Sequence, residues 1–219
     1  MLTTRTWRRI TIWLHVLTSV GWMALAASLA VLLALAAADP VARAPALVAA
    51  HHLDGVLLAP LATGSALTGI VLGAATPYGV FHHWWTTVKF ASTLTLLYLG
   101  IVVLSASLDA AHDDPAAVPP AGLLTATLLM VTAIGFQAWV SIDKPWGRTP
   151  WSAGRPKPVT GPRWMFVVGC TAVVTDLVVG LVIGNPAPVL SVLALVAVLT
   201  GRMWTGRMGN GRRAPVGRA

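Results

Sequence analysis

Long apolar stretches, separated by short polar segments, follow one another along almost all of this 219-residue chain. A helix needs about 20 mainly apolar residues to cross the hydrocarbon core of a bilayer. Six stretches approach or exceed that length, at residues 10–37, 50–74, 84–108, 121–142, 163–184 and 187–204. The pattern therefore predicts an all-α fold, an integral membrane helical bundle over residues 1–204 with six transmembrane helices.

Five transmembrane helices are the alternative, because the sixth stretch is the shortest. Only Asn185-Pro186, a strong turn signal, separates it from the fifth. The two stretches are therefore expected to form a tight hairpin, followed by a basic tail over residues 205–219.

The polar segments carry the basic residues very unevenly. When the chain is threaded through a bilayer, 14 of its 15 Lys and Arg residues fall on one side, and only Arg43 falls on the other. Cationic loops are retained in the cytoplasm. We therefore expect a plasma-membrane protein with both termini cytoplasmic and with anionic lipid headgroups against its basic face. A basic excess confined to these segments indicates topology, so nucleic-acid binding is not expected.

Composition narrows the chemistry further. Hydrophobic residues make up 56% and charged residues 10% of the chain, too few charges to cover a soluble globule. All seven acidic residues are aspartate, which excludes HExxH zinc sites and glutamate bases. The single cysteine, Cys170, excludes CxxC motifs and covalent CxxCH haem attachment. No catalytic residue can be assigned from these patterns.

Polar residues inside the apolar stretches are the first candidates for function, because burying them in lipid is costly. Asp176 is predicted roughly 18 Å along the fifth helix from Trp164, near the middle of the bilayer. Gln137 lies in the fourth helix, and His15 lies about five residues into the first. We expect Asp176 to face other helices, because it continues a line of small residues through Gly180 and Gly184.

The stretch "VFHHWWTTVKF", residues 80–90, opens the third predicted helix. Its tryptophans are typical of an interfacial belt, in which Lys89 would reach back to the headgroups. Alternatively, His82, His83 and Lys89 belong to a binding site. The site hypothesis requires Lys89 to turn inward and to approach His15, which starts from the same membrane face.

A second cluster is expected at the opposite face. His51 and Asp54 are separated by one helical turn, and Asp109 and His112 repeat that spacing on a helix that runs antiparallel. If the two helix ends are neighbours, nitrogen and oxygen ligands converge there, as suits copper(II), nickel or zinc. His51, Asp54 and His112 are therefore candidate metal ligands.

Two motifs resemble known membrane proteins. "WLHVLTSVGW" in the first helix and "HHWWTTVKFASTLTLL" in the third resemble the small bundle of CopD-type copper-resistance proteins and membrane protoporphyrinogen oxidases. On that resemblance His15 matches the first-helix histidine and Lys89 the later lysine, although Thr87 stands where the oxidases often have histidine. "FQAWVSIDKPWGRTPW" is more similar to uncharacterised actinobacterial multi-pass membrane proteins, which imply no activity.

Three functions remain open. The first is a redox membrane protein associated with haem b or quinone, with His15 as axial ligand. In it His82 or His83 is a second ligand or proton donor, and Lys89 is the partner of a propionate or quinone. The second is a metal-ion or small-solute carrier, with Asp176 and Gln137 on the path and His51, Asp54 and His112 at its outer opening. The third is a non-catalytic subunit that docks a protein partner through the basic loop 144–163.

Overall fold

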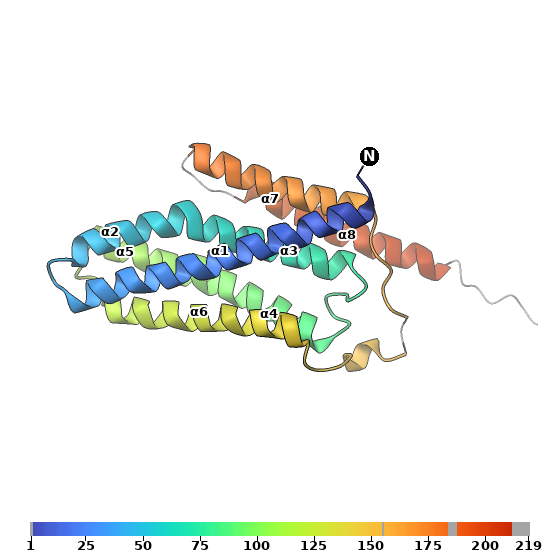
Figure 1. Ribbon diagram of the computed structural model, residues 1–219, viewed down its shortest axis with the longest axis horizontal. Coiled ribbons are helices and arrows are strands. Elements are labelled where there is room, and N and C mark those ends of the chain that lie inside the picture. Colours follow the sequence, from blue (N-terminus) through green and yellow to red (C-terminus); the bar gives the residue numbers. More distant parts are fainter. Residues whose placement is uncertain (1, 155, 184–187, 212–219) are drawn as a thin grey trace, which may run out of the picture.

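The computed structural model describes residues 2–154, 156–183 and 188–211, with side chains up to residue 204. These residues form a bundle of long helices, as predicted (Figure 1). The elements are α1 (Thr4–Ala38), α2 (Arg43–Leu53), η1 (Asp54–Leu58), α3 (Ala59–Ala75), α4 (Trp84–Tyr98), η2 (Leu99–Ser105), α5 (Ala106–Asp113), α6 (Pro120–Asp143), η3 (Pro150–Ser152), α7 (Arg163–Ile183) and α8 (Val189–Gly211).

Within the described residues, five continuous helices are long and apolar enough to cross a membrane: Thr4–Ala38, Arg43–Ala75, Trp84–Asp113, Pro120–Asp143 and Arg163–Ile183. The apolar part of α8 is shorter, Val189–Trp204. The protein is therefore membrane-embedded, with five helices of spanning length and a sixth, α8, whose apolar part is shorter.

The helices extend beyond the predicted apolar stretches because polar ends can also be helical. The Thr3 side chain caps α1 by accepting from the Thr6 amide at 3.2 Å. The backbone of α8 continues to Gly211, so the first part of the predicted tail is helical. Residues 212–219 of that tail lie outside the described residues.

Two of the long helices contain π-helical segments. η1 interrupts the helix between α2 and α3, and η2 interrupts the helix between α4 and α5. In η1 the Ala59 amide donates to the Asp54 carbonyl, the i to i+5 pattern that defines a π-helix. Such segments often occur at functional sites. Nothing in the apolar pattern predicted them.

Helix packing produces two layers. α1 packs on both α3 and α6, and α4 also packs on both, so these helices close into a four-helix unit with the extensions α2 and α5. On the outside of this unit α7 packs against α1 and α3, and α8 packs against α3 and α7. One apolar core lies inside the four-helix unit, around Trp22, Leu58 and Met130, and a second lies between this unit and α7 and α8, around Val71, Phe166 and Val173.

Small residues permit the close contacts between the layers. A Cβ atom at Gly169 would lie 2.9 Å from the Val71 side chain, and one at Gly64 would lie 3.1 Å from Val173. Gly180 is buried, whereas Gly184 lies outside the described residues. Interhelical packing in lipid depends on such close approach.

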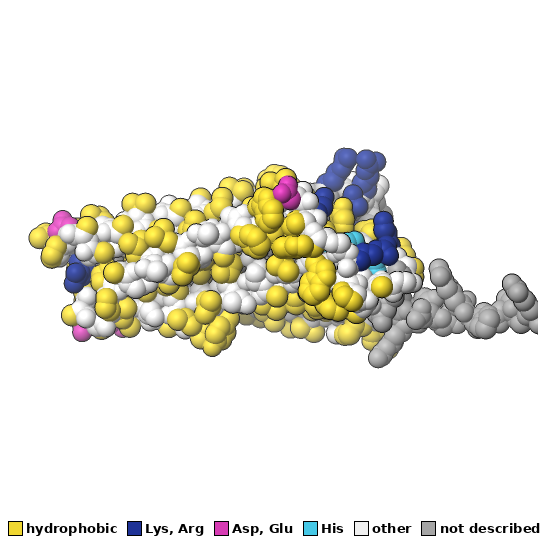
Figure 2. All heavy atoms as spheres, turned by 90° about the horizontal axis from the view of Figure 1, so that it is seen from below, with side chains coloured by type: hydrophobic (Ala, Val, Ile, Leu, Met, Phe, Trp, Pro, Cys, Tyr) yellow, Lys and Arg dark blue, Asp and Glu magenta, His cyan; other side chains and the backbone are white. Residues whose placement is uncertain are grey.

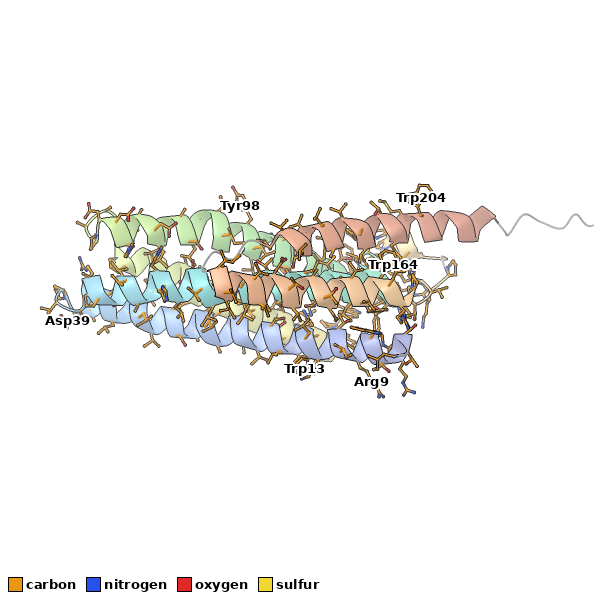
Figure 3. All side chains as sticks on the ribbon, turned by 90° about the horizontal axis from the view of Figure 1, so that it is seen from above. Arg9, Trp13, Asp39, Tyr98, Trp164 and Trp204 are labelled. Carbon is orange, nitrogen blue, oxygen red and sulfur yellow. The ribbon has the colours of Figure 1, made fainter. Side chains whose placement is uncertain are left out.

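Basic side chains gather at one end of the bundle, which also holds the N-terminus and the loops 76–83 and 144–162 (Figure 2). We call this the basic end, and the end near Asp39 the distal end. α7 and α8 cover only the part of the bundle nearer the basic end (Figure 3). The four-helix unit continues past them to Asp39.

The Asp176 side chain caps the first turn of α8, which begins part-way along the bundle. Its carboxylate accepts the amides of Leu190 at 3.2 Å and Ser191 at 2.7 Å, in the first turn of α8. The first amides of a helix have no partner within it, and a carboxylate there also stabilises the helix dipole. Asp176 thus faces a neighbouring helix, as expected, and its partners there are backbone amides.

Replacing Asp176 with leucine should lower the free energy of unfolding by at least the roughly 0.5–2 kcal/mol of a lost helix cap. The measurement is denaturant unfolding in detergent, together with protease cleavage at the start of α8. Asp143→Leu is the matched control, since Asp143 is exposed at the end of α6. Equal loss of stability in both variants would contradict the capping role.

Candidate functional site

His15 is held on α1 by contacts with α3. Its Nδ1 lies 3.0 Å from the Ser65 carbonyl oxygen and 3.1 Å from Thr68 Oγ1. When Nδ1–H donates to a carbonyl, Nε2 carries the lone pair. A histidine anchored in this way is oriented to bind a metal or to accept a proton through Nε2.

The ring of His15 is also restrained sterically. It packs against Gly69, where a Cβ atom would lie only 2.9 Å from His15 Cε1. Beside it, Ser19 Oγ donates to the His15 carbonyl at 2.6 Å and lies 2.7 Å from Ser65 Oγ. The imidazole therefore has little freedom to turn away from α3.

Lys89 points across the bundle to α6. Its Nζ donates to Ser141 Oγ, and Ser141 Oγ donates to the Gln137 carbonyl at 2.8 Å. One turn further along α4, Thr93 Oγ1 donates to Gln137 Oε1 at 3.0 Å. The other amide atom, Gln137 Nε2, is buried without a hydrogen-bond partner among the described residues. Lys89 thus turns inward, and its outward-reaching alternative is wrong.

These residues form one polar layer inside the four-helix unit. His15 on α1 contacts α3, and Lys89 on α4 contacts α6, so the two residues belong to helices of the same four-helix unit. We call this the inner polar layer: His15, Ser19, Ser65, Thr68, Lys89, Thr93, Gln137 and Ser141. The structure therefore brings together two of the four residues predicted to bind a cofactor.

The other two, His82 and His83, occupy a loop junction at the basic end. The His82 carbonyl accepts from the Thr149 amide at 3.2 Å and from Ser152 Oγ at 2.9 Å. His83 Nδ1 lies 3.0 Å from the Tyr78 carbonyl oxygen. These contacts fix the loop 144–154 against the loop 76–83.

The tryptophans at this junction pack on aromatic neighbours. Trp84 meets Trp151 edge-to-face at 5.2 Å, and Trp85 meets Tyr78 in the same way at 5.2 Å. Trp151 Nε1 donates to the Phe81 carbonyl at 2.7 Å. The proline-rich loop is therefore held against the start of α4 by aromatic contacts and by this hydrogen bond.

The residues predicted at the opposite face also converge. His51 Nδ1 lies 3.0 Å from Asp109 Oδ1, and the rings of His51 and His112 stack with centroids 4.5 Å apart. Ser105 Oγ donates to Asp54 Oδ2 at 2.6 Å. We call these five residues the distal polar cluster. The pair His51 and Asp54 and the pair Asp109 and His112 lie on neighbouring antiparallel helices. This arrangement brings the residues together, as the sequence suggested.

This convergence does not have the arrangement of a metal centre. Among the described residues, no group of three or more His, Cys, Asp or Glu side chains is placed to hold a metal ion. Asp54 bonds to Ser105, and His51 bonds to Asp109, so these two expected ligands already have partners within the protein. The metal role of His51, Asp54 and His112 gains no support from this geometry.

Sequence reasoning missed most partners in the inner polar layer, although a signal for some was present. Lys89 and Thr93 are spaced i, i+4, as are Gln137 and Ser141. Residues so spaced share one helix face, and two such polar pairs on separate spans indicate a contact between them. The pairing of His15 with Ser65 and Thr68 depends on helix register, which the spacing does not reveal.

Gly69→Ala tests the restraint on His15. Alanine in an exposed or loosely packed helix position should stabilise by about 0.5–1 kcal/mol relative to glycine. Gly122→Ala is the control, because nothing lies within 4 Å of a Cβ atom there. We expect Gly122→Ala to raise the melting temperature in detergent and Gly69→Ala to lower it. A stabilising Gly69→Ala would show that the imidazole is free to move.

No protein-family model, no curated protein and no solved structure matches the chain.

Proposed function

We propose that this protein is a membrane redox protein that binds haem b or a quinone at the inner polar layer. The observation that carries the proposal is that His15 and Lys89 both make polar contacts with neighbouring helices of one four-helix unit, His15 with α3 and Lys89 with α6. His15 is anchored through Nδ1, which leaves Nε2 for a metal or a quinone oxygen. The resemblance to CopD-type proteins and membrane protoporphyrinogen oxidases rests on the same two residues.

The surroundings suit a group that carries acceptor oxygens. Lys89 supplies a cation, and Gln137 Nε2 supplies a buried donor without a partner among the described residues. A propionate carboxylate and a quinone carbonyl both accept such hydrogen bonds. Either cofactor would provide reversible electron transfer, and the protein would supply binding, orientation and electrostatics.

The two other functions have less support. A carrier path through Asp176 and Gln137 would have to join separate regions, because Asp176 binds the start of α8 and Gln137 binds α4. A docking role for the basic loop 144–163 competes with the bonds that already tie Thr149 and Ser152 to residues 81–82.

Purified protein should contain haem, seen as a Soret band, or an extractable quinone. His15→Ala should abolish or greatly reduce the bound cofactor, because it removes the anchored nitrogen, and Lys89→Met should weaken retention. His52→Ala is the control, since His52 is exposed on α2. Absorption spectroscopy and solvent extraction are the measurements. Neither cofactor in folded wild-type protein, or equal retention in the His15 and His52 variants, would refute the proposal.

We further propose that the protein lies in the plasma membrane with its basic end in the cytoplasm. The basic residues at that end and the acidic segment at the other support this orientation. The basic end would then lie against anionic lipid headgroups.

A reporter active only in the cytoplasm should give signal when fused after Ala219 and none when inserted beside Asp114. The measurement is reporter activity in intact cells at matched expression levels. Signal from the Asp114 insertion would reverse the orientation and leave the fold unchanged.

A further inference from the structure

We propose that the cavity beside the start of α8 binds the ring of a membrane-dissolved molecule that carries one hydroxyl group, such as a phenol. The cavity has a volume of about 170 Å³ and is lined by residues of α3, η2, α7 and α8. It lies where α8 begins, part-way along the bundle (Figure 3). The site is separate from the proposed cofactor site, because neither His15 nor Lys89 lines it.

The cavity has a buried floor and an open rim. Gly64 of α3 and Ser191 of α8 are buried at the floor, whereas Ile101 of η2 lies at the rim and is 46% exposed. Asp176, which also lines the cavity, lies about 18 Å along α7 from Trp164. The rim therefore opens at the depth of the hydrocarbon core, and a ligand enters from the lipid.

Ser191 supplies a hydroxyl group that has no partner among the described residues. Hydroxyl groups on helices often donate to a carbonyl oxygen one turn earlier, as those of Thr18, Thr63 and Thr68 do here. Ser191 is only 3% exposed and lines the cavity, yet its Oγ bonds to none of the described residues. A buried hydroxyl group without a partner is costly. Its position therefore points to a ligand oxygen in the cavity.

Asp176 supplies the complementary acceptor. Its carboxylate oxygens accept the amides of Leu190 at 3.2 Å and Ser191 at 2.7 Å. A carboxylate has about four lone-pair sites, so acceptor capacity remains after these two bonds. A ligand hydroxyl can donate to Asp176 while it accepts from Ser191 Oγ. An ether, a carbonyl group or a hydrocarbon cannot make both bonds.

The size and the remaining lining of the cavity fit one ring. The other lining residues are mainly apolar, among them Ala59, Val173 and Leu177. An apolar cavity of about 150 Å³ in another protein holds one benzene molecule. Apolar contacts with the ring would supply most of the affinity, and the two polar contacts would fix its orientation. The cavity thus has room for a single ring with its hydroxyl group.

The test is fluorine NMR on the protein in lipid nanodiscs, with three probes of similar shape. 4-Fluorophenol should give one saturable bound signal after subtraction of the signal from empty nanodiscs. 4-Fluoroanisole can accept a hydrogen bond but cannot donate one, and 4-fluorotoluene can do neither. Each missing hydrogen bond should weaken binding about threefold to tenfold, the usual net effect of a neutral hydrogen bond.

Two pairs of variants locate the bound probe. Ser191→Ala should weaken the binding of 4-fluorophenol by the same factor and leave that of 4-fluorotoluene unchanged. Ser28→Ala is the control, because Ser28 is exposed on α1. Ala59→Phe should abolish the binding of all three probes by filling the cavity, whereas Ala91→Phe, at an exposed position of α4, should leave it unchanged.

His15→Ala separates this site from the proposed cofactor site and should leave the binding of 4-fluorophenol unchanged. The inference is overturned if no saturable signal appears, if the three probes bind equally, or if His15→Ala removes binding while Ala59→Phe retains it. Equal binding would describe an apolar slot for lipid acyl chains. The comparison of probes uses the wild-type protein, so it decides the question even where Ala59→Phe impairs folding. Absence of haem and quinone from the purified protein would refute only the proposed function.

Discussion

Hydrogen bonds between side chains of different helices are the interaction on which this structure depends. Lipid offers no partner to a polar group, so each polar residue in a span must find one within the protein. His15 meets Ser65 and Thr68 of α3, and Lys89 meets Ser141 of α6. These contacts specify which helix faces which, something that apolar side chains specify poorly when the surroundings are equally apolar.

The same requirement separates the interior into regions of different chemistry. The inner polar layer contains a histidine and a lysine, whereas the distal polar cluster contains two aspartates and two histidines. Between them lie Trp22, Leu58 and Leu96, packed in the apolar core. The two polar regions are therefore separate within one four-helix unit, because the intervening side chains carry no charge.

Much of this arrangement is contained in the sequence. Apolar stretches predicted the spans, and the equal spacing of His51 with Asp54 and of Asp109 with His112 predicted their convergence. The inward direction of Lys89 was one of two alternatives that its place one turn inside a helix left open, and the hydrogen bond to Ser141 supports it. These inferences succeed because helical periodicity assigns residues to faces.

Other features of the structure could not be predicted from the sequence. The π-helical segments depend on a local shift of backbone hydrogen bonds, which no residue type between Asp54 and Leu58 requires. The bond between Asp176 and the amides of α8 depends on where α8 begins relative to α7. Backbone amides are present at every position except proline, so their use as partners leaves no mark on the sequence.

The partial coverage of the bundle by α7 and α8 has a consequence for the surrounding lipid. The apolar run in α1, residues 10–37, measures about 42 Å along the helix, whereas the apolar part of α8, Val189–Trp204, measures about 24 Å. A hydrocarbon core of about 30 Å matches neither length. The two sides of the molecule therefore impose opposite mismatches on the bilayer, which tilting and local thinning relieve.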